Sequence, residues 1–152
     1  MKDKDFLKAK VILDKKLTES GQRRTIERYR ILEEIYARND HFQAEELYNY
    51  LQEISFPVSR ATVYNVLDLL VELKLVTKHQ FSETHAFRYE KAFGRKQHSH
   101  LICVDCHKVL EFCDPRLQVI QDSIAQYYQH AITDHSLILY GQCERENCNK
   151  KI

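Results

Sequence analysis

Apolar residues recur at helical spacing through the first half of the chain. The spacing predicts a first helix over residues 5–20 that ends before Gly21, and further helices over about residues 25–38, 44–54 and 60–73. The apolar positions that define these helices are Phe6, Leu7, Val11, Ile12, Ile26, Tyr29, Leu32, Ile35, Tyr36, Leu47, Tyr48, Leu51, Ile54, Val63, Val66, Leu67 and Leu70.

The third and fourth predicted helices are joined by a short turn that contains Pro57. Ser59 can cap the fourth helix, because its hydroxyl can accept a hydrogen bond from a backbone N–H of the first turn. Helix, short turn and helix is the layout of a helix-turn-helix. Two runs, residues 76–81 and 85–90, then predict a β-hairpin. Such a hairpin is a wing, so residues 1–90 are predicted to form a winged helix-turn-helix DNA-binding domain.

The pattern changes after residue 90. Residues 91–97, which include Gly94, are predicted to be a linker, and residues 98–152 a small α/β domain. With roughly 60 residues and a modest core, this domain needs a bound metal, a partner subunit, or both. The fold class is therefore α+β. The elements predicted in this domain are strands over residues 101–104 and 109–112, a helix that Asp114 caps and that continues from Pro115 through Leu117, Ile120, Ile124 and Tyr127, and a strand over residues 131–140.

Charge is distributed unevenly along the chain, although the net charge is only +1. Residues 1–30 contain ten Lys/Arg and five Asp/Glu, whereas residues 31–60 contain two and six. A basic N-terminal arm suits contact with phosphates, and a solvated amphipathic helix would give the same pattern. No apolar run approaches the ~20 residues that cross a bilayer, and the first residues do not read as a secretory signal. A cytoplasmic protein without a membrane partner is expected.

Four of the five cysteines fall into two close pairs. Cys103 and Cys106 are separated by two residues, and Cys143 and Cys148 by four. Two such thiolate hairpins can close a tetrahedral site of four cysteines, which suits structural Zn²⁺. A redox C-x-x-C would need a thioredoxin-like βαβ context, which the pattern lacks. The fifth cysteine, Cys113, follows an apolar strand and is expected to be buried as a small hydrophobic residue.

A histidine pair, His98 and His100, precedes the first cysteine pair. In an extended segment, residues two apart lie on the same side of the strand, so both imidazoles can face one ion. A histidine pair on the surface without any ligand would have the same spacing. The residues alone therefore indicate a winged helix and a zinc knuckle, and leave the role of the histidines open.

Four segments of the chain together resemble the ferric uptake regulator family. The resemblance extends from about Gly21 to Cys148. It implies a metal-dependent transcriptional repressor, not an enzyme, that controls iron-uptake genes. Such a repressor binds AT-rich palindromic operators in double-stranded DNA as a homodimer, has no small-molecule substrate, and uses its second domain for dimerisation. The segments are AEELY at residues 44–48, ATVY at 61–64, HSHLICVDC at 98–106 and TDHSLILYG at 133–141.

The resemblance implies a regulatory metal site whose ligands come from both domains. His41 and Glu90 would come from the DNA-binding side, and His98, His100 and Glu111 from the dimerisation side. Three imidazoles and two carboxylates suit Fe²⁺, Mn²⁺, Co²⁺ or Zn²⁺. An ion that needs both domains stabilises one relative orientation of them, which provides a mechanism for switching DNA binding.

Many family members carry a further metal site next to this one. Three of its four positions have other residues here, namely Gln97, Ser99 and Gln118, and only His135 remains. We therefore expect the additional site to be absent or very weak, and His135 to be a core histidine or an outer partner of the regulatory site.

The resemblance also implies which residues approach DNA, with the fourth helix in the major groove. Tyr64 would contact a thymine methyl or a base edge, and Asn65, where the family commonly has Arg, can bond adenine bidentately. Basic residues near the second helix would approach phosphates or the AT-rich minor groove. The DNA-binding residues are therefore predicted to be Arg23, Arg28, Arg60, Thr62, Tyr64 and Asn65.

Zinc-, peroxide- and haem-responsive regulators of the same family are alternatives. The regulatory set lacks the cysteine of a zinc-uptake regulator, for which Cys113 is the only candidate, and it has Glu90 where a peroxide sensor typically has Asp. Haem could use a histidine together with Cys113. Two other classes, a structural zinc-ribbon adaptor and a zinc hydrolase that uses His98, His100 and Glu90, agree less well with the sequence. A catalytic zinc needs an open position and a substrate pocket, and a hydrolase would leave the helix-turn-helix without a role.

Overall fold

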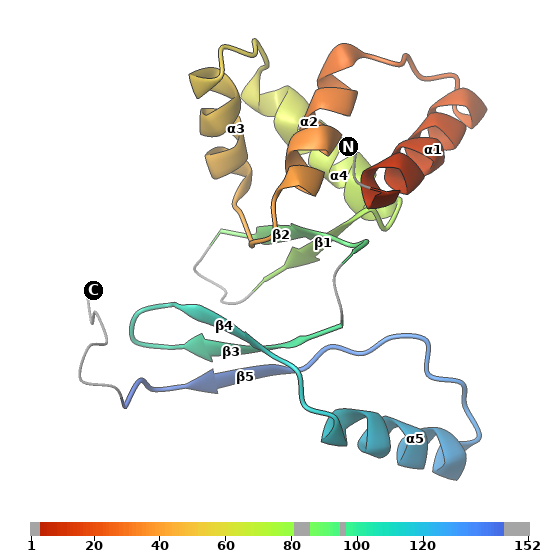
Figure 1. The fold of residues 1–152 in the computed structure, drawn as a ribbon, viewed down its shortest axis with the longest axis vertical. Helices are drawn as coiled ribbons and strands as arrows, with labels where there is room; N and C mark the ends of the chain where they lie inside the picture. The colour runs from red at the N-terminus through yellow and green to blue at the C-terminus, as the bar shows by residue number, and fades with distance from the viewer. Residues whose placement is uncertain (1–3, 81–85, 95–96, 145–152) are drawn as a thin grey trace. The chain divides into compact units, whose positions relative to one another are not determined.

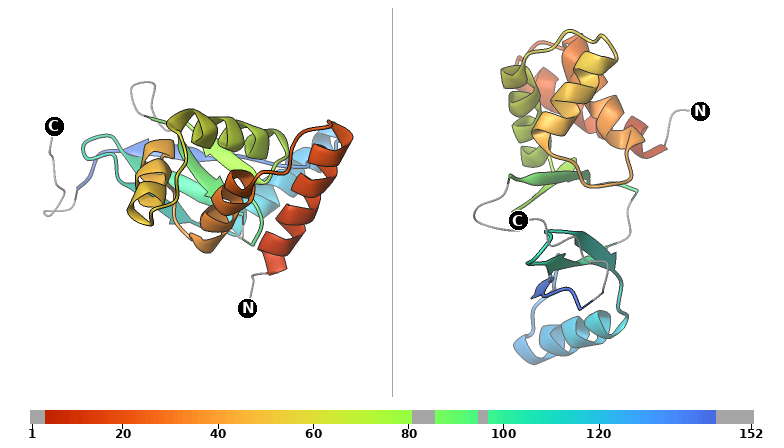
Figure 2. Two further views of the ribbon diagram at one scale, coloured as in Figure 1. Left: turned by 90° about the horizontal axis from the view of Figure 1, so that it is seen from above. Right: turned by 90° about the vertical axis from the view of Figure 1, so that its left-hand side faces the viewer.

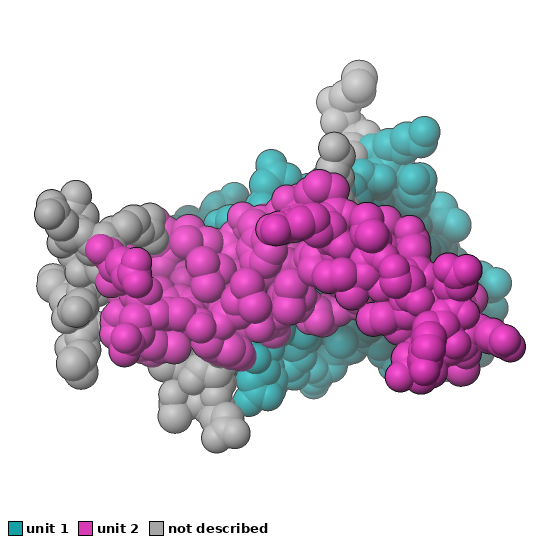
Figure 3. Space-filling view, turned by 90° about the horizontal axis from the view of Figure 1, so that it is seen from below, with its two compact units in different colours: residues 1–95 teal, residues 96–152 magenta. Residues whose placement is uncertain are grey.

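The computed structural model of the chain describes residues 4–80, 86–94 and 97–144. The chain divides into two compact units, residues 1–95 (unit 1) and residues 96–152 (unit 2), which are coloured separately in Figure 3. Among the described residues, no helix is both long enough and apolar enough to cross a membrane. Each unit has its own sheet; the described residues form four helices in unit 1 and one in unit 2, in keeping with an α+β fold.

Unit 1 consists of four helices that lie to one side of a two-stranded antiparallel sheet (Figure 1). The sheet pairs Thr77 with Glu90 and His79 with Arg88. Leu75 and Ala92 extend the contact between the two strands, because Ala92 donates its backbone N–H to the Leu75 carbonyl at 3.0 Å. The elements are α1 (Lys4–Glu19), α2 (Ile26–Ala37), α3 (Ala44–Glu53), α4 (Arg60–Glu72), β1 (Val76–His79) and β2 (Arg88–Lys91).

The helices of unit 1 pack around one hydrophobic core. Most of its fully buried side chains come from the helices, which explains why the apolar spacing in the sequence located these helices well, while Phe42 precedes α3 and Leu75 directly precedes β1. The largest of them are Phe42, Leu13, Leu17, Ile31, Leu32, Ile35, Leu47, Leu51, Leu67, Leu70, Leu75 and Val63. Burial of such side chains stabilises a fold by about 1.5–3 kcal/mol each.

Two helix faces differ from the prediction. In α1 the buried residues are Phe6, Ala9, Leu13 and Leu17, whereas Leu7 and Val11 are exposed. The buried residues are spaced by three or four positions, so they share one face of the helix. Ala9 lies on this face, and its small side chain lets α1 pack closely against the rest of the core. Ile26, one of the apolar positions that define the second predicted helix, is the first residue of α2 and is 77% exposed.

Local hydrogen bonds fix the ends of the helix-turn-helix. The Ser59 hydroxyl accepts from the Thr62 backbone N–H at 3.1 Å, which confirms the predicted N-cap of α4. At the start of α3, the Glu46 carboxylate accepts from the Gln43 backbone N–H at 2.7 Å. Ser55, with φ of 57°, ends α3 and turns the chain towards α4.

Unit 2 is a three-stranded sheet with one helix to one side of it (Figures 1 and 2). The strand order is β4-β3-β5, in which β3 is antiparallel to β4 and parallel to β5. The connection from β4 to β5 passes through the helix and returns along residues 129–137. The elements are β3 (Ser99–Cys103), β4 (Val109–Phe112), α5 (Arg116–Tyr128) and β5 (Ile138–Gly141).

The helix start predicted at Asp114 and Pro115 is found, but the N-cap of α5 is Pro115 and not Asp114, and the first helical residue is Arg116. The Asp114 carboxylate accepts from the Arg116 backbone N–H at 2.9 Å and contacts the Arg116 guanidinium. These hydrogen bonds hold the pKa of Asp114 at about 2, below its ordinary value.

Two further predictions for unit 2 were wrong. The strand predicted over residues 131–140 covers only Ile138–Gly141, because polar side chains bond to the backbone just before it. Asp134 accepts from the His135 backbone N–H, and Gln97 donates to the His135 carbonyl. Cys113 is exposed and not buried, and its thiol lies 3.5 Å from the Gln97 carbonyl.

Candidate metal and DNA-binding sites

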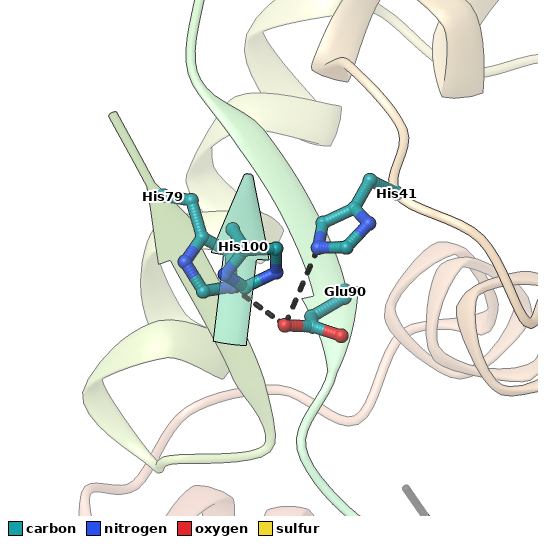
Figure 4. Close-up of side chains that lie close together, drawn as sticks. All are labelled: His41, His79, Glu90 and His100. Atoms are coloured by element: carbon teal, nitrogen blue, oxygen red, sulfur yellow. Dashed lines mark hydrogen bonds and ion pairs between the residues drawn. The ribbon is translucent and has the colours of Figure 1, made fainter. Parts of the chain in front are cut away.

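His41 and Glu90 are brought together by a backbone bridge inside unit 1. Phe42 and Tyr89 exchange both backbone hydrogen bonds, at 3.0 and 2.8 Å, so the segment before α3 lies against β2. His41 directly precedes this bridge and Glu90 directly follows it. His41 Nε2 lies 3.5 Å from Glu90 Oε1 (Figure 4). The predicted unit 1 ligands therefore form a pair within one unit.

A third residue of unit 1, His79, joins this pair. Its Nε2 lies 2.6 Å from Glu90 Oε1, the same oxygen that His41 approaches (Figure 4). The imidazole N–H of His79 can donate to this carboxylate. The rings of His41 and His79 meet edge to face, with centroids 5.4 Å apart. The sequence prediction omitted His79. The approach of His79 to Glu90 depends on the register in which β1 and β2 pair, and the sequence of the hairpin turn did not specify this register.

Lys91 secures the same segment from the other side of β2. Its ammonium donates to the Asn39 side-chain oxygen at 2.9 Å and to the Tyr36 carbonyl at 3.2 Å. The Tyr36 carbonyl belongs to the last turn of α2, where helix carbonyls lack partners within the helix. Lys91 is buried and was predicted as the first residue of the linker, whereas it closes β2.

The predicted ligands of unit 2 lie on or next to the paired strands: His100 is in β3, Glu111 is in β4, and His98 directly precedes β3. His100 is the register partner of Glu111, and His98 Nε2 lies 3.9 Å from Glu111 Oε2. The rings of His98 and His100 meet edge to face with centroids 4.9 Å apart. The pairing of His100 with Glu111, and the approach of His98 to the same carboxylate, thus bring three donors of unit 2 close together. Imidazole and carboxylate donors in both units fit Fe²⁺, Mn²⁺, Co²⁺ or Zn²⁺.

His135 is hydrogen-bonded to Gln97, the residue that stands where the additional family site would have a ligand. The Gln97 amide nitrogen lies 2.6 Å from His135 Nδ1 and 3.4 Å from an Asp134 oxygen. The amide N–H₂ donates to the imidazole nitrogen, so this ring nitrogen serves as an acceptor here.

The cysteine segments converge at one end of the unit 2 sheet. Cys103 ends β3 and pairs with Gly141 of β5, and Cys106 follows in the tight turn to β4. The Cys143 backbone N–H donates to the Asp105 carboxylate at 3.1 Å, which ties the second cysteine segment to the first. The fourth predicted ligand, Cys148, lies outside the described residues.

The outward face of α4 carries the predicted DNA-reading residues. Tyr64 and Asn65 are both exposed, while Val63, Val66 and Leu67 anchor the opposite face in the core. Thr62 is half-buried, and its hydroxyl is hydrogen-bonded to Ser59, so its first role is to hold the start of the helix.

Three predicted arginines differ in the partners they have. Arg60 is paired with Glu45 at 2.6 Å, and its guanidinium stacks over Tyr48 at 4.6 Å. Arg28 donates to the Arg23 carbonyl and to the Gln22 side chain, at 2.5 and 2.8 Å, which orders the segment before α2. Arg23 is exposed. A phosphate that recruits Arg60 therefore has to compete with Glu45.

Comparison with known proteins places the chain among metal-dependent regulators. The ferric uptake regulator family matches residues 19–140. The ferric uptake regulation protein of Yersinia pestis is 37% identical over 138 residues, which cover 90% of this chain and 92% of that protein.

Solved structures agree. The ferric uptake regulator of Vibrio cholerae has a TM-score of 0.68 at 36% identity, covering 86% of this chain and 98% of that one. The Pseudomonas aeruginosa regulator, determined with manganese, has a TM-score of 0.75 at 30% identity, covering 87% and 98%. With its helix-turn-helix, its wing and this match over most of its length, the protein belongs to the ferric uptake regulator family.

Proposed function

We propose that this protein is a metal-responsive transcriptional repressor of iron-uptake genes that binds AT-rich palindromic DNA as a homodimer. The observation that carries the proposal is a pair of half-sites. His41 and Glu90 form one half in unit 1, and His98, His100 and Glu111 form the other in unit 2. Each half gathers its donors by backbone pairing within a single unit.

The proposed switch is a change in the relative orientation of the two units. A divalent ion that takes ligands from both half-sites stabilises only those arrangements in which the half-sites meet. In a two-fold dimer, the orientation of each unit 1 decides whether the two α4 helices can enter successive major grooves. The ion thus acts as an effector whose affinity is coupled to that of DNA.

The donor set supports Fe²⁺ as the regulatory ion, with Mn²⁺ or Zn²⁺ able to occupy the same site. Imidazole and carboxylate ligands suit these ions, and the five proposed donors include no thiolate. The family name and the manganese in the Pseudomonas aeruginosa relative are consistent with this choice.

The proposed DNA contacts begin with α4, on which Tyr64 and Asn65 read base edges and Arg60 and Thr62 lie near the first turn. Arg23, in the segment before α2, and Arg28, in the first turn of α2, approach the DNA backbone or the minor groove. A single protomer would make few contacts at physiological salt, where phosphate contacts weaken steeply. Two protomers on a palindrome double them.

Unit 2 is proposed to supply the dimer interface and to hold a structural zinc ion through Cys103, Cys106, Cys143 and Cys148. The topology supports this role, because Cys143 is tied to the Cys103–Cys106 turn through Asp105. When bound, such an ion contributes folding free energy. α5 supports the interface, since it buries none of its residues within the chain.

A cytoplasmic, non-enzymatic protein follows from this proposal. Within the family, the absence of a cysteine among the proposed regulatory ligands disfavours a zinc-uptake regulator, and Glu90 disfavours a peroxide sensor. A haem-responsive regulator would need Cys113, which is exposed and hence available. A hydrolase and a zinc-ribbon adaptor leave the exposed reading face of α4 without a function.

The test is a titration of an AT-rich palindromic duplex with the full chain, with and without Mn²⁺, and with Fe²⁺ under anaerobic conditions. We expect DNA affinity to rise by about 5- to 150-fold with metal, the usual range of allosteric coupling. The double substitution His98→Ala/His100→Ala should abolish this rise and leave the zinc content unchanged. His130→Ala, which removes an exposed histidine beyond the end of α5, is the matched control.

An undiminished rise in DNA affinity in the double variant would show that the switch lies elsewhere. Binding that is independent of both metal and sequence would support the adaptor.

A further inference from the structure

We propose that His79 is a metal ligand, and that His41, His79 and Glu90 form a three-donor cation site carried entirely by unit 1. The inference deepens the proposed metal response and rests on it for His41 and Glu90. It adds a donor outside the five residues proposed above. It also means that unit 1 can hold an ion whether or not unit 2 contributes.

The first support is the position of His79 in the hairpin. β1 and β2 pair Thr77 with Glu90, and His79 lies two residues beyond Thr77, on the same face of β1. A residue diagonal to its neighbour in this way can reach it with a long side chain. The backbone register therefore sets His79 and Glu90 side by side.

The second support is convergence at a single oxygen. His79 Nε2 and His41 Nε2 lie 2.6 and 3.5 Å from the same atom, Glu90 Oε1, and the donor atoms of all three residues lie within 4.8 Å of one another. Ligand atoms that are each about 2.1 Å from an ion stand about 3–3.5 Å apart. Shifts of the imidazoles by about an ångström would convert the present contacts into a coordination shell.

The third support is the independent anchoring of the three segments. His41 is held by the bridge between Phe42 and Tyr89, whose side chains are 1% and 3% exposed. Glu90 lies next to Tyr89 in β2, and His79 closes β1. None of these anchors involves unit 2. A site of this kind is preorganised, so an ion binds without ordering a loop.

The donor chemistry indicates the class of ion. Two imidazoles and one carboxylate suit Zn²⁺, Fe²⁺, Co²⁺ or Ni²⁺ better than Mg²⁺ or Ca²⁺, which prefer all-oxygen shells. Three protein ligands leave room for a further donor, and the unit 2 half-site could supply it. A regulator with this arrangement would load its DNA-binding unit first.

The experiment removes the donors of unit 2 and asks what remains. The zinc-loaded full chain with His98→Ala/His100→Ala is titrated with Co²⁺, and binding is followed by the d–d absorption of the ion and by equilibrium dialysis. We expect one bound Co²⁺ per chain. Adding His79→Ala should weaken it by at least about tenfold, since even the loss of an outer partner of a ligand costs that much.

His79→Gln separates ligation from hydrogen bonding. Glutamine keeps an N–H donor for Glu90 but removes the imidazole, so it should weaken Co²⁺ binding as alanine does. If glutamine restores the affinity, His79 only positions Glu90 and the inference is wrong. Absence of any Co²⁺ binding in the His98→Ala/His100→Ala chain, with circular dichroism unchanged, would overturn it equally. His130→Ala in the same background is the control.

The outcome is separate from that of the proposed function. A wild-type chain whose DNA affinity ignores Mn²⁺ would contradict the metal-responsive repressor, even if Co²⁺ binds to His41, His79 and Glu90. Conversely, if the unit 1 residues alone bind no Co²⁺, the further inference fails, but a metal response that needs ligands from both units still stands.

Discussion

Three successive residues of β2 make three different kinds of contact. Tyr89 bridges to Phe42 and packs in the core, Glu90 receives the imidazoles, and Lys91 bonds to the end of α2 and to Asn39. Because successive side chains of a strand point to opposite faces, the Glu90 carboxylate and the Lys91 ammonium point away from each other although they are neighbours in sequence. The position of His41 thus depends on Lys91 as well as on the backbone bridge.

Lys91→Met should destabilise unit 1 while keeping most of the apolar stem. The Tyr36 carbonyl and the Asn39 side chain would lose their buried donor, at a cost of about 1–3 kcal/mol. Urea unfolding followed by circular dichroism measures this loss. Lys15→Met, at a lysine whose side chain is 76% exposed, is the control and should change stability by less than about 0.5 kcal/mol. Equal effects of the two substitutions would mean that the Lys91 bonds contribute nothing.

Single residues were the hardest level to predict. Ser59 could be assigned as a cap from its type and position, because capping is local. His41, Glu90 and the unit 2 ligands came from the family resemblance and not from spacing, since residues far apart in sequence meet only through strand register. His79 was missed for the same reason. Cys113 was expected to be buried, but residue type alone does not show which face of a strand end meets solvent.

At the scale of elements, α5 is the one helix in the described part of the chain that buries no residue. Its apolar side chains gather on one side, and Ile120, Ile124 and Tyr127 are 52%, 46% and 80% exposed. On β5, Leu139 and Tyr140 are 44% and 57% exposed. Apolar surface of this extent is typical of a protein interface, which favours a second copy of the chain as its cover.

Ile124→Lys should weaken the proposed homodimer. A lysine in the centre of an apolar interface removes a contact and buries a charge, so we expect the dissociation constant to rise by at least about tenfold. Sedimentation equilibrium measures it. Gln126→Lys adds the same charge on the other side of α5 and should leave the dimer intact. If both variants associate as the wild type does, the interface does not include this face of α5.

Helices were predicted better than strands. Periodic apolar residues located α2, α3 and α4 to within a few residues, because burial against a single core selects one helix face. In α1 the helix was right but the buried face was not, since Ala9 gave a weak apolar signal. β5 proved shorter than its alternating pattern suggested, because Asp134 and Gln97 satisfy the backbone before Ile138.

At the scale of the whole molecule, the chain is divided into two units, and the proposed metal switch depends on this division. The sequence indicated a change of character near residue 90, where helical periodicity gives way to short strands and cysteines. It could not locate the end of unit 1, because Ala92 and Phe93 reveal their contacts with Leu75 and the core only in the folded chain.

Cys103→Ser should release zinc and disrupt unit 2 while leaving unit 1 folded. The unit has a small core, so the loss of a four-thiolate zinc site would remove much of its folding free energy. Elemental analysis and analytical ultracentrifugation measure zinc content and association. Cys113→Ser is the matched control and should keep both. A Cys103→Ser protein that is zinc-free, folded and dimeric would contradict the assignment.

The parallel pairing of β3 with β5 has a consequence for synthesis. The ribosome releases the amino end first, so the four helices and the hairpin of unit 1 can fold while β3 still lacks its outer neighbour. A chain that ends before Ile138 would therefore have a complete unit 1 but would lack β5, the parallel neighbour of β3. If unit 2 supplies the dimer interface, as proposed, such a truncated chain would carry a folded DNA-binding unit without the means to dimerise.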